Sequence, residues 1–304
     1  MFTDKAVYFL YAISPVHAGS GQGLGLVDNP IQREKHTSHP VIAGSGIKGA
    51  LRHHVMKDWD EGDVTAIFGP SSGAGSDLHA GAISFADAQL VAFPLRSLKG
   101  GFVYATSAGA LGRLSRMLGI AGKSFVDVGD PGEDRALVAD EGLLSNDRLT
   151  LEDFQFSATR DEAVAQTGSR LAELVLPERE GFSWFRRKLS KHLVVLPEQA
   201  LAEFCRSSTV IEPHVRIDDE TGTASTGGLF YTENTPPETI FAGMVMASCE
   251  RTGSKEPRSG GQVMARVVRG VEGGQGLDDS IVQVGGDATT GRGQVLLTVT
   301  GVGE

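Results

Sequence analysis

The chain has 304 residues, of which 40% are hydrophobic and 22% charged, and its formal net charge is −10. No apolar run approaches the roughly 20 residues that cross a bilayer. The cysteines, Cys205 and Cys249, form no CxxC motif, so disulfide scaffolds and cysteine-based zinc sites are not expected. The N-terminus lacks the basic and apolar pattern of a secretory signal, which favours a cytoplasmic protein with no membrane partner.

The charge is unevenly distributed along the chain. Residues 125–180 contain 14 Asp or Glu and five Arg, whereas Ile31–Lys57 contains five Lys or Arg, one Glu and four His. A local basic surface can bind phosphates on an acidic protein, because salt screens charges beyond about 8 Å. A solvated face explains the same charges, so composition alone leaves nucleic-acid binding open.

Apolar and β-branched segments predict strands along the chain. We expect these strands at Ala6–Ser14, Gly81–Ala92, Phe102–Thr106, Val210–Ile217, Gly228–Thr232, Ile240–Ala247 and Gln294–Val302. Helical spacing of apolar residues predicts helices at 44–55, Ser107–Leu118, Pro197–Arg206 and Gly260–Gly274. Strands and helices mix without strict alternation, so the expected fold class is α+β.

Two segments stand apart from this pattern. The acidic stretch 125–180 reads as irregular, and we expect it to belong to an insertion at about 110–185. Around the small, polar segment Asp218–Gly227, the two arms of a β-hairpin are expected over about 209–235. Such a tip has little to bury, so the hairpin is expected to project from a single domain that spans 1–304.

The loop HAGSGQGLGLVDNPIQR at 17–33 follows the first expected strand. Its glycines at 19, 21, 23 and 25 do not give GxGxxG and no helix follows at once, which argues against a dinucleotide site. Glycines let a polyanion approach the backbone closely. Asp28 would repel a phosphate unless it binds a metal or accepts a proton, and both serve phosphodiester cleavage. The alternative is a turn residue before Asn29-Pro30.

A helix is expected to begin in GSGIKGALR at 44–52, with Ser45 as its N-cap. Free amides at a helix N-terminus attract anions, and Lys48 and Arg52, four residues apart, lie on one face. The spacing does not match Walker A, so an RNA phosphate fits better than a nucleoside triphosphate. An ordinary capped helix with solvated cations explains the same residues.

Two further motifs have alternative explanations. The GPSSG segment at 69–73 matches GxSxG, but a proline precedes the serine and a Gly/Ser loop follows, so a nucleophile elbow is not expected. The GGDATTGRG segment at 285–293 has hydroxyls, glycines and Arg292 that suit a phosphate backbone, although a tight hairpin would explain it too. The histidines show no metal-binding spacing.

Four segments, at 17–52, 81–100, 215–239 and 285–295, together resemble the RAMP superfamily, and most closely the backbone subunit of the Cmr-type (type III-B) CRISPR effector. The 17–52 segment is the most specific of them. The resemblance implies a ferredoxin-like (RRM-related) palm with insertions and a protruding β-hairpin thumb. It also implies partners: guide CRISPR RNA, target RNA, further copies of the chain in a filament, and other Cmr-type subunits.

The resemblance further implies an endoribonuclease that cuts paired target RNA at regular intervals through attack of the RNA's own 2′-hydroxyl. Asp28 is the implied key acid, either as ligand of Mg²⁺ or Mn²⁺ or as the base that takes the hydroxyl proton. His17 and Glu233 are the other implied catalytic residues, although Asn234 departs from the aromatic residue of some relatives. The expected RNA contacts are Ser20, Gln22, Arg33, Lys35, Ser45, Lys48, Arg52, Arg216, Gly285, Gly286, Thr289, Thr290 and Arg292.

Two rivals share this fold: a scaffold that binds RNA without cutting it, and a stand-alone RAMP endonuclease that processes CRISPR transcripts. Asp28 distinguishes the first, because a subunit that does not cut needs no acid in that loop. Cleavage of a repeat RNA by the purified chain alone would distinguish the second.

Overall fold

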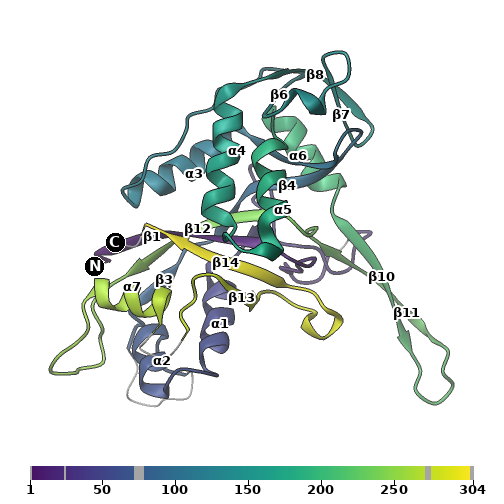
Figure 1. The fold of residues 1–304 in the computed structure, drawn as a ribbon. Coiled ribbons are helices and arrows are strands. Elements are labelled where there is room, and N and C mark those ends of the chain that lie inside the picture. Colours follow the sequence, from purple (N-terminus) through teal and green to yellow (C-terminus); the bar gives the residue numbers. More distant parts are fainter. Residues whose placement is uncertain (1, 24, 72–78, 271–274, 302–304) are drawn as a thin grey trace.

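A computed structural model describes residues 2–23, 25–71, 79–270 and 275–301 (Figure 1). The strands are β1 (Asp4–Ala12), β2 (Val41–Ile42), β3 (Ile83–Phe85), β4 (Ala88–Ser97), β5 (Gly101–Ser107), β6 (Arg135–Val138), β7 (Arg148–Leu151), β8 (Phe154–Arg160), β9 (Leu193–Leu196), β10 (Val210–Ile217), β11 (Ala224–Asn234), β12 (Ile240–Ala247), β13 (Ser280–Gln283) and β14 (Gln294–Thr300). The α-helices are α1 (Gly44–Val55), α2 (Glu61–Phe68), α3 (Ala108–Ile120), α4 (Glu162–Val175), α5 (Ser183–Lys191), α6 (Glu198–Ser207) and α7 (Gly260–Arg269). The expected α+β class is confirmed.

The central part of the main sheet has the order β14–β1–β12–β4, and all three of these pairings are antiparallel. The chain reaches β3 and β4 from β1 through α1, and reaches β14 from β12 through α7. Each helix therefore connects two strands that are not neighbours. This connectivity is that of a βαββαβ unit, with β1 in the middle of the sheet.

The long strand β4 extends the sheet into a second group of strands. Its first residues pair with β12, and Phe93–Ser97 pair with β5. From β5 the order continues through β9, β6, β8 and β7, and one pair, Ser97 with Leu151, returns to β4. These six strands form a closed, barrel-like ring in the upper part of Figure 1.

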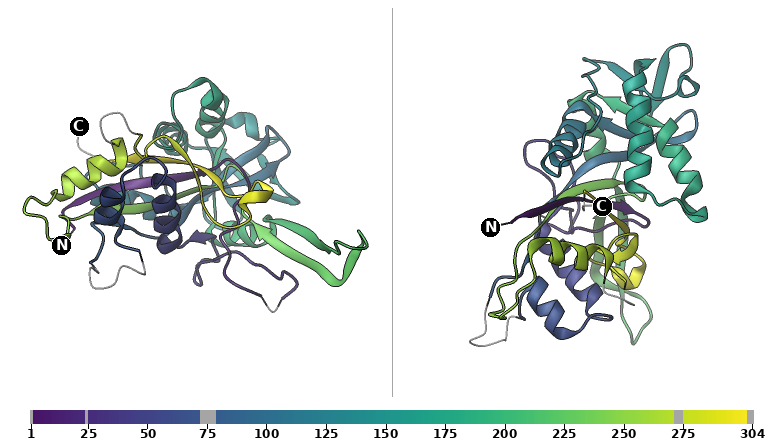
Figure 2. Two further views of the ribbon diagram at one scale, coloured as in Figure 1. Left: turned by 90° about the horizontal axis from the view of Figure 1, so that it is seen from below. Right: turned by 60° about the vertical axis from the view of Figure 1, so that its left-hand side comes forward.

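Helices cover both faces of the central sheet (Figure 2). Tyr8 and Leu10 of β1 belong to the core that packs against Ile47 and Leu51 of α1 and Val263 of α7. Val7 and Phe9, on the opposite face of β1, belong to a second core with residues of α3 and α4. Strand β1 is thus buried on both faces, which accounts for its nearly continuous apolar sequence.

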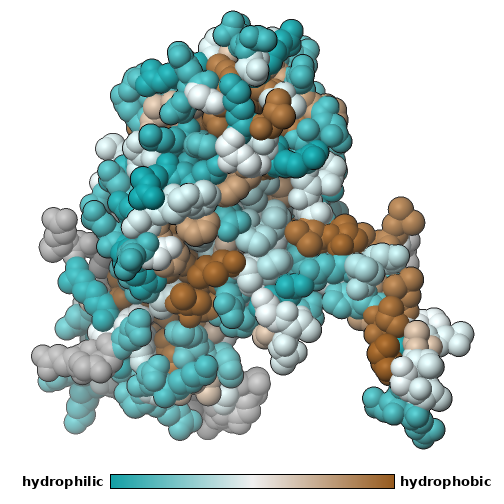
Figure 3. Space-filling view, turned by 45° about the vertical axis from the view of Figure 1, so that its right-hand side comes forward, coloured by the Kyte–Doolittle hydropathy of each residue, from teal (hydrophilic) through white to brown (hydrophobic). Residues whose placement is uncertain are grey.

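The hairpin of β10 and β11 projects from the body (Figure 1), and its ladder confirms the hairpin expected at 209–235. Side chains on one face are apolar and exposed, as Figure 3 shows. They are Ile211, Val215, Ile217, Leu229 and Tyr231. The opposite face carries polar groups, among them Arg216 and a His214 ring that stacks on Phe230 with centroids 5.1 Å apart.

The structure corrects two expectations. The acidic stretch 125–180 is not irregular: it contains β6, β7, β8 and α4, because its apolar residues alternate in the strands and Val164, Leu171 and Val175 form the buried face of α4. Ser45 is not the N-cap of α1. The cap is Ala43, and the Asp87 carboxylate accepts from the Gly44 amide at 2.8 Å.

Three expected features lie partly outside the described residues: the GPSSG segment, the end of the helix expected to reach Gly274, and the last residue of the final strand. No helix among the described ranges is long and apolar enough to cross a membrane.

Candidate functional site

The loop after β1 covers the free edge of β11 at the base of the hairpin. Val16 exchanges two backbone hydrogen bonds with Thr235, each 3.0 Å long, and Asn29 accepts from the Glu233 amide at 3.0 Å. Between these two backbone contacts, the His17 ring bonds to the Glu233 carbonyl, and the Glu233 carboxylate accepts from the Ile31 amide. The loop therefore blocks strand addition at this edge and holds Asp28 and His17 beside one strand.

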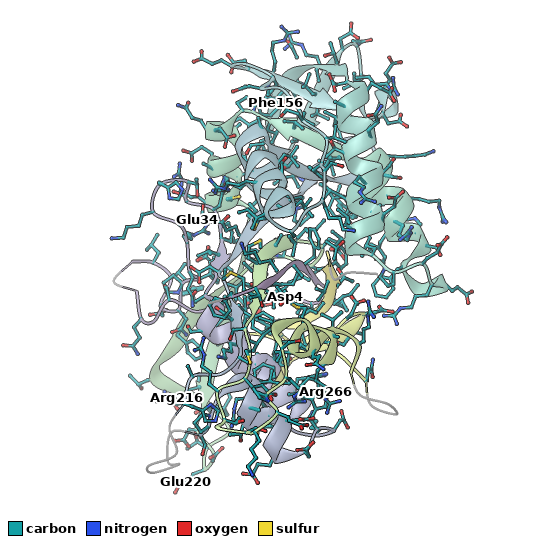
Figure 4. All side chains as sticks on the ribbon, turned by 90° about the vertical axis from the view of Figure 1, so that its left-hand side faces the viewer. Asp4, Glu34, Phe156, Arg216, Glu220 and Arg266 are labelled. Atoms are coloured by element: carbon teal, nitrogen blue, oxygen red, sulfur yellow. The ribbon has the colours of Figure 1, made fainter. Side chains whose placement is uncertain are left out.

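Asp28 is exposed, and its Oδ2 accepts a hydrogen bond from the Tyr231 amide at 2.8 Å. The carboxylate lies in a groove between the loop and the hairpin. Two other predicted RNA contacts line this groove, Gln22 on the loop and Arg216 on the hairpin. Figure 4 shows Arg216 on the projecting part of the molecule, with Glu220 beyond it. The structure thus brings the predicted acid, a cation and an amide side chain to one open surface.

His17 lies farther along the same strand edge. Its Nδ1 is 2.7 Å from the Glu233 carbonyl oxygen, so Nδ1 carries the proton and donates. The His17 carbonyl accepts from the Gly286 amide at 2.9 Å. Gly285 has a φ of +84°, and a Cβ there would collide with the His17 carbonyl oxygen. The predicted glycines therefore allow the C-terminal loop to approach His17.

Glu233 is buried, with 6% exposure. Its Oε1 accepts from Arg33 Nη2 at 2.5 Å and from the Thr209 hydroxyl at 2.8 Å, while Oε2 accepts from the Ile31 amide at 3.0 Å. Arg33 also donates to the Ser38 and Cys205 carbonyls. Because both charged groups are fully engaged, their geometry favours positioning of the site over direct contact with RNA.

Arg292 is likewise engaged within the fold. Its guanidinium forms a two-point contact with Glu212 on β10, with nitrogen–oxygen distances of 3.1 and 2.5 Å. Glu212 also accepts from the Asn234 side chain at 3.4 Å. The pair joins the C-terminal loop to the hairpin, so a phosphate at Arg292 would have to compete with a carboxylate that already faces it.

The N-terminus of α1 is tied to the same loop. Gln32 donates to the Gly19 carbonyl at 2.9 Å and accepts from the Ala43 amide at 3.0 Å. Ser45, the next residue but one, is exposed. The Gly44 amide is already bonded to the Asp87 carboxylate, so the amides of Ser45 and Gly46 are the ones that suit a further anion at this helix start.

The two cations of α1, Lys48 and Arg52, have different surroundings. Lys48 donates to the Ile83 carbonyl at 3.1 Å, and burial lowers its pKa. Arg52 lies one turn farther from the helix start and contacts the sulfur of Met56 at 3.4 Å. Lys48 is therefore partly used in packing α1 against β3.

The remaining predicted contacts lie on exposed loop surfaces. Ser20 uses its hydroxyl and amide on the Pro30 carbonyl, at 3.1 and 2.9 Å, and Lys35 is exposed. Thr289 and Thr290 are exposed in a short 3₁₀ turn, where the Thr290 hydroxyl donates to the Asp287 carbonyl at 2.8 Å. Their hydroxyl and ammonium groups remain accessible to a phosphate.

A divalent metal at Asp28 would have a sparse protein ligand set. Across the described ranges, no three His, Cys, Asp or Glu residues gather as a metal cage. One oxygen of Asp28 already accepts from Tyr231. Mg²⁺ is commonly held by one or two carboxylates together with waters and substrate phosphates. Asp28 fits that kind of shared site and does not fit a site made by protein alone.

Sequence reasoning missed the supports of the site. Tyr231 supplies the amide that holds Asp28, Gln32 links the loop to α1, and Thr209 and Glu212 complete the two ion-pair clusters. Glu212 carried a weak signal, because it is an acid among the polar positions of one face of the expected hairpin. The Tyr231 contact uses a backbone group, which leaves no trace in residue type.

The arrangement of the strands, the loop after β1 and the C-terminal glycine-rich loop defines a class of protein. The family model of the RAMP superfamily matches residues 9–295, and the chain belongs to this superfamily.

Among its relatives, the chain is 33% identical over 293 residues to "CRISPR system Cmr endoribonuclease Cmr4" of Pyrococcus furiosus, covering 95% of this chain and 94% of the relative. It also resembles the solved structure of oligomeric Cmr4 from P. furiosus, with a TM-score of 0.72, 26% identity and 98% of each chain covered. A chain of the Type III-B Cmr-beta complex bound to cognate target RNA shares the fold, with a TM-score of 0.74, 20% identity and 98% of each chain covered.

Proposed function

We propose that this chain is a backbone subunit of a type III-B CRISPR effector, that it holds guide RNA, and that it cuts paired target RNA at regular intervals with Asp28 as the key acid. Asp28 carries the proposal: its exposed carboxylate lies in an open groove with Gln22 and Arg216. The relative that is 33% identical is named an endoribonuclease, which supports cleavage as the activity.

The expected domain plan is part of the proposal. The βαββαβ connectivity of β1, α1, β4, β12, α7 and β14 supports a ferredoxin-like palm. The hairpin at 209–235 would be the thumb that interrupts the guide–target duplex, and 110–185 the insertion. Oligomeric Cmr4 and a Cmr complex bound to target RNA support copies of the chain, other subunits and target RNA as partners. We expect the assembly to act in the cytoplasm.

The chemistry we propose is attack of a target 2′-hydroxyl on the adjacent phosphorus. The new bond closes a cyclic phosphate, the bond from phosphorus to the 5′-oxygen breaks, and the leaving oxygen takes a proton from water to become a 5′-hydroxyl. Asp28 would accept the proton of the attacking hydroxyl or orient it. His17 cannot donate through Nδ1, which is committed to the Glu233 carbonyl, so its Nε2 is the nitrogen available to the RNA. Arg216 would hold a phosphate in the groove, and Glu233 would position the loop through Arg33.

A bound Mg²⁺ or Mn²⁺ would neutralise charge on the reacting phosphate. Asp28 is the residue we expect to hold it, with phosphate oxygens and waters completing its ligands.

A non-catalytic scaffold is the second candidate, and one observation favours it. The Asp28 carboxylate accepts from the Tyr231 amide, and this contact gives the residue a structural reason to be present. Asparagine at 28 separates the two functions, because its side-chain oxygen can accept the same hydrogen bond without a charge.

We expect Asp28→Asn to leave assembly and thermal stability unchanged and to slow target cleavage by about 10²-fold or more, the usual loss on removing a general base. The measurement is cleavage of an end-labelled complementary RNA by the guide-loaded complex, with magnesium or with EDTA. Asp219→Asn on the hairpin tip is the matched control and should cut normally. Normal, regularly spaced cutting by Asp28→Asn would show that Asp28 is not the key acid, and RNA binding without cutting by both forms would leave only the scaffold candidate.

A further inference from the structure

Helix α5 carries an unusual concentration of positive charge for an acidic protein. Its sequence SWFRRKLSK contains four Lys or Arg and no Asp or Glu. Arg186 is used internally, since its Nη1 donates to the Ala172 and Leu176 carbonyls. The other three cations, Arg187, Lys188 and Lys191, line one pocket together with Gly100, Trp184 and His192.

Lys188 forms the floor of this pocket. The residue is 6% exposed, and its ammonium donates to the Gly100 carbonyl and, at 2.7 Å, to His192 Nδ1. It also lies 4.6 Å from the centroid of the Phe102 ring. No carboxylate pairs with it among the described residues. A buried cation without a counter-charge is costly, and here it raises the positive potential where the pocket opens to solvent.

The rim of the pocket is accessible. Trp184 is 52% exposed, and its ring is held edge-on against Phe185, with centroids 5.0 Å apart. Arg187 and Lys191 are exposed, and their side chains form no ion pair or hydrogen bond within the described part of the chain. These residues are spaced i, i+3 and i+7 from Trp184, so they share one face of α5.

The α5 surface, which comprises Trp184, Arg187, Lys188 and Lys191, is supported by the strand that leads to the candidate site. Phe185 packs edge-on against Tyr11 of β1 at 6.2 Å, and the loop that carries His17 and Asp28 begins directly after β1. The groove at Asp28 and the α5 surface are thus held by a common element, although none of the groove's lining residues belongs to α5.

We propose that the α5 surface is a second binding site for single-stranded RNA, with a base stacked on Trp184 and phosphates bound by Arg187 and Lys191. An exposed aromatic ring between cations is the combination that binds single strands without reading their sequence. An acidic protein segment would satisfy the cations but would leave the exposed indole face without a stacking partner. This inference rests on the proposed function only in that RNA is the ligand.

The test measures binding of a labelled oligouridylate to the purified full-length chain by anisotropy across salt concentrations. Arg187→Ala with Lys191→Ala should weaken binding and lower the slope of log K against log salt by about 1.4, for two phosphate contacts on a single strand. Arg116→Ala with Lys123→Ala, which removes two exposed cations near α3, is the matched control and should leave the slope unchanged.

Trp184 supplies a second readout. We expect RNA to quench tryptophan emission in the wild type and not in Trp184→Leu, and this substitution should weaken binding about tenfold through lost stacking. Equal affinity and slope in the α5 double variant and its control would overturn the proposal. Equally tight binding of polyglutamate, lost in the same variants, would assign the surface to an acidic protein instead. Because cleavage is not measured, RNA binding here would stand even if Asp28→Asn cut normally.

Discussion

At its base, the β10–β11 hairpin is joined to the body by two carboxylate–guanidinium pairs, whereas beyond Val215 its described side chains and amides hydrogen-bond only within the hairpin. The two ion pairs at the base of the hairpin are Glu233 with Arg33 and Glu212 with Arg292. In the outer half, Ile217 and Leu229 are 54% and 55% exposed. One half is fixed by the body, and the other presents apolar surface to solvent.

This difference indicates separate roles for the two halves. The base determines where Asp28 lies, because the Tyr231 amide and the Glu233 backbone hold the loop. The outer half lines the groove with Arg216, but none of its described groups hydrogen-bonds to the loop that carries Asp28. Substitutions at the base of the hairpin should therefore alter the stability of the fold and the position of Asp28. Substitutions at the tip should alter only the contacts that the hairpin makes with other molecules.

The largest effect is expected at the Arg33–Glu233 pair, whose carboxylate is 8% exposed and whose guanidinium is 21% exposed. Arg33→Ala leaves the Glu233 carboxylate buried without its cation, and we expect a loss of about 3 kcal/mol in the free energy of unfolding. Urea denaturation measures it. Hydrogen exchange should also become faster at the Ile31 amide, which donates to the same carboxylate.

The second ion pair at the base of the hairpin is the matched control for this prediction. The side chains of Arg292 and Glu212 are 25% and 23% exposed, so solvent screens them. Arg292→Ala should cost about 1 kcal/mol or less. Similar losses at the two pairs would mean that burial does not distinguish them, and that the base is held mainly by its backbone hydrogen bonds.

A smaller effect on stability is expected at the tip. Removal of Asp219–Ser225 leaves both ion pairs at the base of the hairpin intact. The free energy of unfolding should therefore change by no more than about 0.5 kcal/mol. If the hairpin interrupts the guide–target duplex, as proposed, its shortening should make the products of target cleavage lose their regular spacing while guide RNA still binds. Replacement of the same residues by Gly and Ser at equal length is the control. Regular spacing after the deletion would contradict a role for the arm.

Much of the fold could be predicted because it rests on local patterns. The strand at Ile240–Ala247 has the predicted bounds, the hairpin follows its polar tip, and the resemblance to the RAMP superfamily is confirmed. The expectation for 125–180 was wrong because it rested on the 14 acidic side chains of that stretch and not on the spacing of its apolar ones. The apolar residues recur at strand and helix spacing, and that spacing decides the structure.

The sequence predicted which kinds of residue lie at the site better than it predicted which residues contact one another. The loop residues Gln22 and Asp28 do meet Arg216 across the groove, from positions far apart in the sequence. Charge alone could not show that Arg33 and Arg292 already have carboxylate partners. Nor could it show that α5 concentrates its free cations around an exposed tryptophan, because that depends on which face of the helix is buried.

The smallest expected effect concerns Glu238, five residues after Glu233. Unlike Glu233, its carboxylate has no cation beside it in the described structure, and burial raises its pKa to about 6. The folded chain therefore binds this proton more tightly than the unfolded chain, and stability should fall as pH rises from about 4.5 to 6. Glu238→Gln should remove this part of the pH dependence in thermal melts. The variant should match the wild type at pH 4, where the carboxyl is protonated in both states, and should melt slightly higher at pH 7. Parallel melting curves at all pH values would show that the carboxylate is solvated, and that the contrast between the two glutamates does not hold.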